Sequence, residues 1–192
     1  MSITFHSDQL LWNAFKAGNR DALSNLFKTY YPILYRYGQK IHNNHHEVEE
    51  NIQEFFLYLY ERRARLTTPD SIKSYLLKSF RRRLLNHLEQ SRSHRKRMAQ
   101  YADQLVDIQF SVDEIMVRQE VSDHIRHIFV DMLNALPKRQ REVIYLRYYD
   151  QLTIAEVAQV LSISYQGAVN TAYKAIKALR TNETLSQISA FI

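Results

Sequence analysis

Glycine and proline are scarce in this sequence, and that scarcity constrains its fold more than any other feature. Three glycines and three prolines occur in 192 residues, far below the roughly 7% and 5% of an average chain. A turn-rich β-sandwich needs many such residues, whereas long helices need few. Apolar residues recur at helical spacing along most of the chain and do not alternate with period two over a useful length. The sequence therefore predicts an all-α protein.

The first domain that the sequence predicts is a helical bundle over residues 1–97. Asn19 is placed to open one helix of the bundle. Pro32 is expected to open the next one, because proline is tolerated in the first turn of a helix and disrupts its interior. After a break at 67–69, Asp70 is placed to cap a long helix.

Charge is concentrated in blocks along the chain, whose net charge is +6. Residues 62–97 contain twelve basic residues (Lys and Arg) and two acidic residues (Asp and Glu). Residues 98–136 contain two basic and seven acidic residues. Such a basic block favours a polyanion as partner, and a weaker one over 137–192 suggests a second surface for it. The polar and acidic residues 98–118 are predicted to be a linker. Residues 119–192 then form a second helical domain.

Residues 139–180 carry the most specific pattern in the chain. Thr153 and Glu156 have the spacing of a capping box, in which each side chain accepts a hydrogen bond from the backbone N–H of the other. Ile163 is expected to plug the core from the following turn, and Ser164 is placed to cap a long second helix. This order predicts a helix-turn-helix, whose second helix enters the major groove of DNA.

The outward positions of that second helix suit DNA. Amide side chains near its start are able to bond an adenine edge, and cations further along suit phosphates, which fix position without reading sequence. Cations of the preceding helix suit phosphates in the same way. The predicted contact residues are Tyr165, Gln166, Asn170, Lys174, Arg139 and Arg141.

The basic block of the first domain is interleaved with aromatic and amide side chains. Cations hold the nucleic-acid backbone, and aromatic faces stack on unpaired bases. Readout of a duplex needs no such aromatics, so the mixture favours single-stranded or melted DNA. Phe80 is interpreted as a core residue, whereas Tyr75 suits either the core or a stacked base. The candidate residues are Tyr75, Lys78, Arg81, Arg82 and Asn86.

The residues that the sequence lacks argue against an enzyme. There is no cysteine, which removes disulfide scaffolds, Cys-ligated zinc and thiol nucleophiles. His42 and His46 have helical spacing but no third ligand placed by spacing, so we expect no metal site and no cofactor. Glu49 and Glu50 are adjacent and point apart on a helix, and no phosphate-cradling glycine loop is present.

No targeting or membrane signal is visible in the sequence. No apolar run approaches the roughly 20 residues of a membrane span, and the first residues have neither the basic nor the apolar part of a secretion signal. The absence of cysteine fits a reducing compartment. We therefore expect a cytoplasmic protein without membrane insertion.

Motifs in both predicted domains match one known family. The second domain contains LPKRQREV at 136–143, IAEVAQVLSIS at 154–164 and KAIKALR at 174–180, and the first contains EENIQEFFL at 49–57 followed by the basic stretch 71–86. In these motifs the chain resembles the sigma-70-type RNA polymerase sigma factors. It is most similar to their small extracytoplasmic-function (ECF) group, which has only domains 2 and 4. The resemblance implies two helical sigma domains joined by the acidic linker.

The same resemblance implies a function and its partners. An ECF sigma factor binds core RNA polymerase and directs promoter-specific transcription initiation, and an anti-sigma factor is a further expected partner. Domain 4 would read the −35 element of promoter DNA through Tyr165, Gln166 and Asn170, and domain 2 would hold the −10 element as it melts through the candidate residues of the basic block. The acidic linker would run through the RNA-exit path. The residues that would dock on the polymerase are Glu50, Ile52, Gln53, Phe56 and Leu57.

Glu50 and Asn51 depart from the family's pattern in the first motif. Five further departures lie in the predicted DNA-binding segments, so the resemblance does not extend to particular base contacts: Arg82, Asn86, Gly167, Val169 and Thr171. Two alternatives from other classes stay open. One is a stand-alone helix-turn-helix transcription regulator with a helical dimerisation or sensing domain, which would dimerise and bind a palindromic site without polymerase. The other is a helical interaction protein such as an adaptor.

Overall fold

A computed structural model describes residues 8–93, 106–114 and 123–181, and all regular structure in these ranges is helical. The prediction of an all-α protein is therefore confirmed for the described residues. The chain divides into two compact units, one holding Met1–Gln104 with Gln159–Ser162 and the other Leu105–Ala158 with Ile163–Ile192. None of the helices described is long and apolar enough to cross a membrane.

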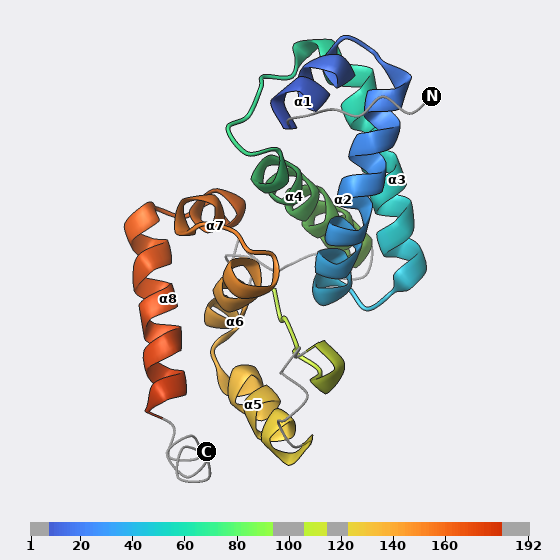
Figure 1. Ribbon diagram of the computed structural model, residues 1–192. Coiled ribbons are helices and arrows are strands. Elements are labelled where there is room, and N and C mark those ends of the chain that lie inside the picture. The colour runs from blue at the N-terminus through green and yellow to red at the C-terminus, as the bar shows by residue number, and fades with distance from the viewer. Residues whose placement is uncertain (1–7, 94–105, 115–122, 182–192) are drawn as a thin grey trace. The chain divides into compact units, whose positions relative to one another are not determined.

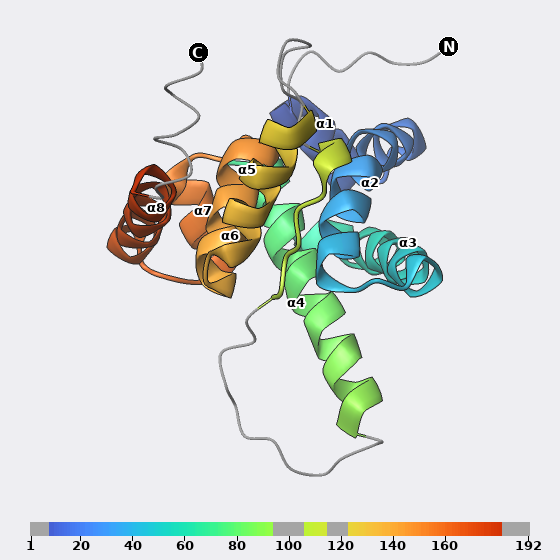
Figure 2. The same ribbon diagram turned by 90° about the horizontal axis from the view of Figure 1, so that it is seen from below.

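Unit 1 is a bundle in which helix α2 is central (Figure 1). Its elements are α1 (Asp8–Lys16), α2 (Arg20–Ile41), α3 (His45–Arg62), the 3-10 turn η1 (Arg63–Arg65) and α4 (Ile72–Ser93). Helix α2 packs against α1, α3 and α4, and α3 packs against α4. Figure 2 shows α4 extending well beyond the helices that it packs on.

Proline does not break α2, and here the sequence-based boundary was wrong. Pro32 lies inside a continuous 22-residue helix. Its missing N–H and its ring cost about 3 kcal/mol in a helix interior. The stripe of Tyr30, Leu34 and Tyr37 is buried on both sides of the proline, so packing of one unbroken apolar face outweighs that cost. The presence of proline in the sequence, taken without the packing, predicts two helices.

The close approach of α2 to its neighbours depends on a glycine. A Cβ atom at Gly38 would lie 2.6 Å from Val48 Cγ1 on α3 and 3.2 Å from Phe80 Cε1 on α4. Both of those side chains are fully buried. Phe80 is therefore a core residue, as the sequence predicted.

Helix caps follow the sequence with one exception. The Asn19 side chain accepts from the Ala22 N–H at 3.0 Å, as predicted. The cap of α4 is Ser71, whose hydroxyl oxygen accepts from the Ser74 N–H at 3.3 Å, so the prediction of Asp70 was wrong by one residue. Because serine and aspartate are both good caps, composition could not choose between the neighbours.

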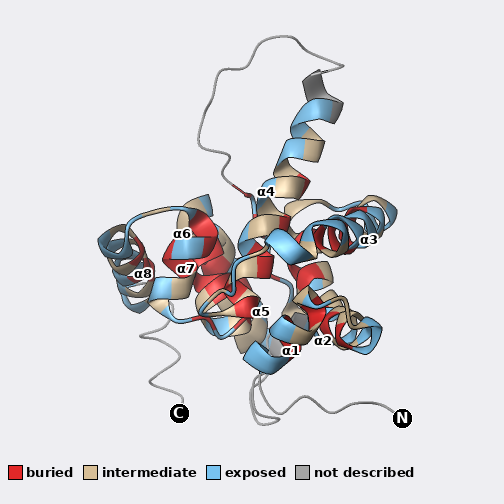
Figure 3. Cartoon of the chain, turned by 90° about the horizontal axis from the view of Figure 1, so that it is seen from above, coloured by how far each residue is buried: buried red, intermediate tan, exposed pale blue. Residues whose placement is uncertain are grey.

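Unit 2 contains the predicted helix-turn-helix. Its elements are η2 (Val112–Glu114), α5 (Asp123–Ala135), α6 (Lys138–Ile144), the π-helical turn η3 (Tyr145–Tyr149), α7 (Ile154–Leu161), whose last turn from Gln159 is grouped with unit 1, and α8 (Tyr165–Arg180). Helix α8 packs on α6 through a face of small residues, and Figure 3 shows this face buried while the opposite face is exposed. The small residues on the buried face are Ala168, Ala172 and Ala175.

The predicted caps of the helix-turn-helix are confirmed. The Thr153 hydroxyl oxygen accepts from the Glu156 N–H at 3.3 Å, and the Glu156 carboxylate accepts from the Thr153 N–H at 2.7 Å. Ser164 accepts from the Gly167 N–H at 3.0 Å. Ile163, expected as a core plug, is only partly buried.

Part of the predicted linker is folded into unit 2. The described residues of 98–118 are 106–114, and the Phe110 backbone exchanges two hydrogen bonds with the Asn134 side chain, at 2.8 and 3.0 Å. The Phe110 ring lies 5.4 Å from that of Tyr149, and Ile108 is fully buried. The structure therefore differs from a tether that runs to residue 118, and the second unit begins before the predicted residue 119. The rest of the predicted linker lies outside the described residues.

Candidate nucleic-acid interface

The outward face of α8 gathers four of the six residues predicted to contact DNA from the second domain. Tyr165 is 60% exposed, and Gln166, Asn170 and Lys174 are exposed on the same helix. The Gln166 amide nitrogen donates to the Asn170 side-chain oxygen at 3.0 Å. The two amides that suit a base edge are therefore neighbours and already bonded to each other.

Sequence reasoning missed one residue of this face. Tyr173 is 64% exposed and follows Gln166 by seven residues, two helical turns further along. That spacing places its ring between the amides near the start of α8 and the later lysines. The i,i+7 relation to Gln166 is the signal in the sequence that points to this tyrosine.

The two arginines predicted from the preceding helix lie inward. Arg141 is buried, with its guanidinium bonded to the Asn134 backbone carbonyl at 2.9 Å and to the Asp107 carboxylate. Arg139 is 19% exposed and lies 3.6 Å from the buried Glu142 carboxylate. A phosphate contact from Arg141 therefore conflicts with the structure, because its charge is taken up inside unit 2.

Among the positions that depart from the family's pattern, Thr171 has a local explanation. Its hydroxyl donates to the Gly167 backbone carbonyl at 2.7 Å, so it bonds within its own helix. Gly167 has an ordinary helical backbone, and a Cβ there would lie 3.0 Å from the capping Ser164 hydroxyl oxygen. Glycine at this position leaves the cap unobstructed. Val169 is partly exposed.

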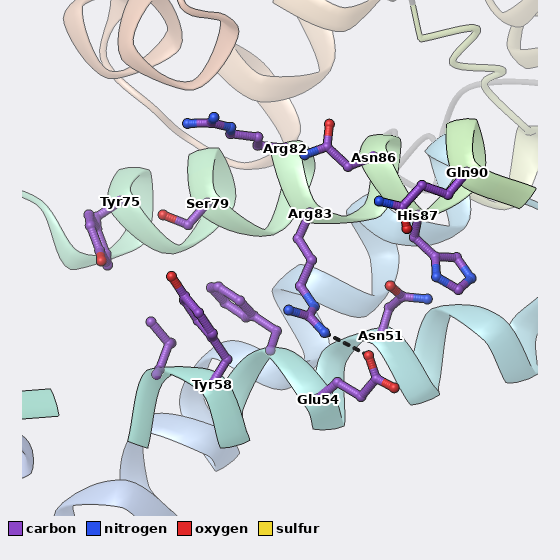
Figure 4. A pocket seen from close by; sticks show the side chains of 12 residues that line it. Asn51, Glu54, Tyr58, Tyr75, Ser79, Arg82, Arg83, Asn86, His87 and Gln90 are labelled. Carbon is purple, nitrogen blue, oxygen red and sulfur yellow. Dashed lines mark hydrogen bonds and ion pairs between the residues drawn. The ribbon is translucent and has the colours of Figure 1, made fainter. Parts of the chain in front are cut away.

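The residues predicted for melted DNA divide between two faces of α4. Tyr75, Arg82 and Asn86 line a pocket of about 630 Å³ between α3 and α4, which Figure 4 shows in close-up. Lys78 is exposed and Arg81 partly buried, and neither lines the pocket. The structure therefore brings three of the five predicted residues together.

Helix α3 forms the other wall of this pocket. The sequence analysis did not predict that α3 contributes to it. Glu54 pairs with Arg83 across the two helices at 2.6 Å (Figure 4). The guanidinium carbons of Arg62 and Arg83 lie 4.7 and 5.9 Å from the centre of the Tyr58 ring, which is 39% exposed. The spacing of four residues predicts that Glu54 and Tyr58 lie on the same face of α3. It does not predict that this face packs against α4.

Tyr75 has both of the roles that the sequence left open. Its ring meets the buried Trp12 ring edge-on, with centroids 5.4 Å apart, and it also lines the pocket. Burial raises the pKa of its hydroxyl, a hydrogen bond with Ser79 opposes that effect, and the nearby Tyr58 adds to it. The hydroxyl is therefore a neutral hydrogen-bonding group at pH 7.

The loop before α4 is fastened to α1. The Trp12 indole N–H donates to the Thr67 backbone carbonyl at 3.0 Å, and the Thr68 hydroxyl donates to the Asn13 side chain at 3.3 Å. Trp12 contacts both this loop and Tyr75. It therefore fixes the end of α4 where the pocket begins.

The residues predicted to dock on the polymerase fall into an exposed group and a buried group. Glu50, Gln53 and Leu57 are exposed, with Leu57 at 59%. Ile52 is fully buried and belongs to the core. Phe56 is 5% exposed and lies beneath an apolar groove between α2 and α3. The groove is lined by Arg20, Leu23, Ser24, Phe27, Phe56, Leu57 and Tyr60.

Comparison with known proteins identifies both units. Residues 26–94 match the family model described as Sigma-70 region 2, and residues 126–179 match Sigma-70, region 4. The ECF RNA polymerase sigma factor SigW of Bacillus subtilis (strain 168) is 24% identical over 178 residues, which cover 86% of this chain and 90% of SigW. The factor SigK of Mycobacterium ulcerans (strain Agy99) is 24% identical over 164 residues, 85% of this chain and 86% of SigK.

Solved structures share the fold. CnrH in complex with the cytosolic domain of CnrY matches with a TM-score of 0.60 and 16% identity, covering 90% of this chain and 94% of that one. The sigma factor RpoE in complex with the anti-sigma factor NepR from Bartonella quintana matches with a TM-score of 0.54 and 15% identity. The match covers 82% of this chain and 93% of that one.

The two matched regions make this chain a two-domain transcription initiation factor. It belongs to the sigma-70 family of RNA polymerase sigma factors, in the ECF group. Its function is to direct transcription initiation, and it is not an enzyme.

Proposed function

We propose that the two units of this sigma factor contact separate promoter elements while α3 docks on core RNA polymerase. Unit 2 reads the −35 element with the outward face of α8. Unit 1 holds the −10 element with α4 as the duplex opens. A lone helix-turn-helix reads only one short site, so the polymerase supplies the frame that spaces the two contacts.

The observation that carries this proposal is the chemistry of the α8 face. Gln166 and Asn170 are exposed near the N-terminal end of the helix, where a recognition helix meets base edges. Lys174 and Lys177 follow on exposed positions and suit phosphates. One helix therefore offers base-reading amides and backbone-holding cations in the order that major-groove docking requires.

The α4 pocket supports the assignment to the −10 element. Arg82 supplies charge for the backbone, and Tyr58 and Tyr75 supply aromatic faces. Unpaired bases stack on such faces irrespective of their sequence, whereas paired bases are not available for stacking. The pocket therefore favours the melted state of the DNA.

The outer face of α3 supports docking on the polymerase. The exposed Leu57 stands at the rim of the apolar groove, with Phe27 and Phe56 below it. Glu50 and Gln53 lie on exposed positions of the same helix. An apolar centre with a polar rim is the usual anatomy of a protein interface.

Family membership leads to two further expectations, a regulatory partner and a location in the cell. An anti-sigma factor is the expected regulatory partner, since the solved relative from Bartonella quintana is bound to one. The cytoplasm is the expected location, because promoter DNA and polymerase are both there. The stand-alone regulator is not favoured, since a sensing domain needs an apolar cavity, whereas the α3–α4 pocket of unit 1 mixes aromatic side chains with two arginines, a glutamate and three amides.

Transcription from a promoter library with purified core polymerase tests the proposal. We expect Gln166→Ala with Asn170→Ala to change which −35 sequences are used while binding to core polymerase is unchanged. The control is Gln9→Ala with Asn43→Ala, two exposed amides far along the chain from α8. An unchanged −35 preference in the α8 variant would contradict the assignment of α8.

A further inference from the structure

Helix α1 holds the loop that joins α3 to α4, although none of its residues lines the pocket between those two helices. It packs against η1 at the start of the loop and against α4 at its end, and Figure 1 shows the loop passing beside α1. Residues 66–71 are not helical. Bonds to the rest of the bundle are therefore needed to hold this loop in one shape.

Trp12 of α1 makes two contacts that meet at the start of α4. It is fully buried, and its indole N–H donates to the Thr67 backbone carbonyl at 3.0 Å. Its ring meets the Tyr75 ring edge-on, with centroids 5.4 Å apart and 75° between the planes. One buried side chain therefore links the loop to the first residue of α4 that lines the pocket.

The next residue of α1 adds a third contact with the loop. The Thr68 hydroxyl donates to the Asn13 side-chain oxygen at 3.3 Å, and both residues are exposed. Consecutive residues of α1 thus hold consecutive residues of the loop. The register of the loop against α1 is fixed by one buried bond and one exposed bond.

The other end of the loop is also held against the N-terminal part of the chain. Gly18 follows α1 with a φ of +87°, and a Cβ atom there would lie 3.2 Å from Arg63 Nε. Arg63 belongs to η1, and its guanidinium donates to the Tyr60 backbone carbonyl at 2.6 Å. Helix α1 and the turn after it therefore brace the loop at both ends.

This brace orders one of the two exposed aromatic faces of the pocket. The Tyr58 ring on α3 is held by the guanidinium groups of Arg62 and Arg83, whereas the Tyr75 ring on α4 is held by Trp12. A site whose groups are ordered before binding avoids the entropy cost of ordering them on binding. The contacts of Trp12 therefore strengthen any interaction that uses Tyr75.

We propose that α1 braces the α3–α4 loop for the capture of melted DNA, with Trp12 as the positioning residue. Trp12 does not touch DNA and acts through Thr67 and Tyr75. The inference rests on the proposed function of α4 and deepens it, because the strength of the −10 contact then depends on a helix outside the pocket.

Binding of forked promoter DNA to the full-length chain in complex with core polymerase tests the proposal. The fork is duplex through the −35 element and single-stranded at the −10 element, and the fully paired promoter at low temperature is the reference. Trp12→Phe keeps an aromatic ring and loses the N–H donor. We expect it to weaken binding of the fork about threefold to tenfold, the range for one net hydrogen bond. Binding of the paired promoter and of core polymerase should be unchanged.

Leu34→Val is the matched control for a loss of stability. Leu34 is buried in α2 and lines neither the α3–α4 pocket nor the apolar groove. The variant should lower the unfolding temperature, because it leaves a cavity in the core, but it should keep the affinity for the fork. An equal loss of fork binding in Leu34→Val and Trp12→Phe would show that Trp12 acts only through stability, which overturns the proposal.

The exposed bond between Asn13 and Thr68 allows a test that leaves the core intact. Asn13→Ala and Thr68→Val each break this bond and should weaken fork binding about twofold. The double variant should be no weaker than either single variant, because the same bond is lost, and Thr68→Ser should bind like wild type. Additive losses would mean that Thr68 meets the DNA itself, and would overturn its part in the brace.

The outcomes separate this inference from the function on which it rests. Unchanged fork binding in Trp12→Phe and in Asn13→Ala overturns the brace but leaves α4 as a DNA-binding helix. A wild-type complex that binds the fork no more tightly than the paired promoter overturns the proposed −10 contact together with the brace.

Discussion

At the scale of single residues, unit 2 contains a charge cluster that is structural. Asp107 bonds Lys138 at 2.9 Å and also pairs with the buried Arg141. The hydrogen bond from Lys138 is the largest of the effects that hold the pKa of Asp107 below its usual 3.8, and the charge of Arg141 adds to it. One carboxylate therefore joins residues 106–114 to α6.

We predict that Asp107→Asn destabilises unit 2 by about 1–2 kcal/mol at pH 7, because Arg141 keeps its buried charge and its bond to the Asn134 carbonyl but loses the carboxylate that neutralises it. A carboxylate with a lowered folded pKa stabilises the fold above its unfolded pKa, and that contribution is lost as pH falls through the folded pKa. The difference between wild type and variant should therefore shrink below about pH 4. Urea unfolding at pH 7 and pH 3 measures it, and an equal difference at both would contradict the role of the charge.

Sequence alone could not place Arg141 correctly. Its partner lies 34 residues upstream, in a stretch whose acidity and irregular periodicity suggested a linker. No local pattern connects the two positions. By contrast, the exposure of Gln166 and Asn170 followed from helical spacing and a cap at Ser164, which are local and were predicted.

At the scale of elements, the crossing of α2 with α3 and α4 has little room at Gly38. We predict that Gly38→Ala destabilises unit 1 by about 1–3 kcal/mol, the usual cost of overpacking a core, although alanine favours a helix by about 1 kcal/mol over glycine. Gly167→Ala is the matched control, since the nearest atom there is a rotatable serine hydroxyl 3.0 Å away. Thermal unfolding should show a clear loss at Gly38 and a small change at Gly167.

The outer face of α3 allows a matched test of docking. Leu57 and Leu10 are exposed to nearly the same extent, 59% and 57%, but only Leu57 lines the apolar groove. We predict that Leu57→Asp weakens binding to core polymerase by about tenfold or more, as for a central interface residue. Leu10→Asp should leave it unchanged. Equal effects of the two variants in a pull-down titration would contradict the docking face.

Element boundaries were predicted where local chemistry decides them. The capping box of Thr153 and Glu156 and the cap at Asn19 are short-range features and appear as expected. Pro32 and the 106–114 segment were misjudged, because burial against distant residues outweighed a helix breaker in one case and polar composition in the other. The α3 wall of the pocket was missed for the same reason, since periodicity gives the face of a helix but not its partner.

At the scale of the whole molecule, the proposed function requires one unit to hold duplex DNA and the other to hold melted DNA. We predict that Arg82→Ala reduces open-complex formation about threefold to tenfold, while closed-complex formation changes little. The reason is that Arg82 lines the pocket where aromatic faces favour unpaired bases. Permanganate reactivity of thymines reports opening, and gel shift at low temperature reports the closed complex.

The control for this prediction is Arg36→Ala, an exposed arginine on α2 that lines neither the pocket nor the apolar groove. Loss of one positive charge weakens general attraction to DNA equally in both variants. An Arg82→Ala variant that loses the closed and the open complex to the same degree would show that the arginine acts only through its charge.

The bond between Gln166 and Asn170 couples the two amides that we propose as readers of the −35 element. The bond uses one of the two amide hydrogens of Gln166 and one lone pair of the Asn170 oxygen, so each amide keeps groups that suit a base. A rotation of either amide toward a base alters the hydrogen bonding of the other. Replacing either residue also frees the survivor to adopt new rotamers. A change in promoter preference would then require substitutions at both positions. The effects of the two single substitutions on promoter preference would not add up to the effect of the double substitution.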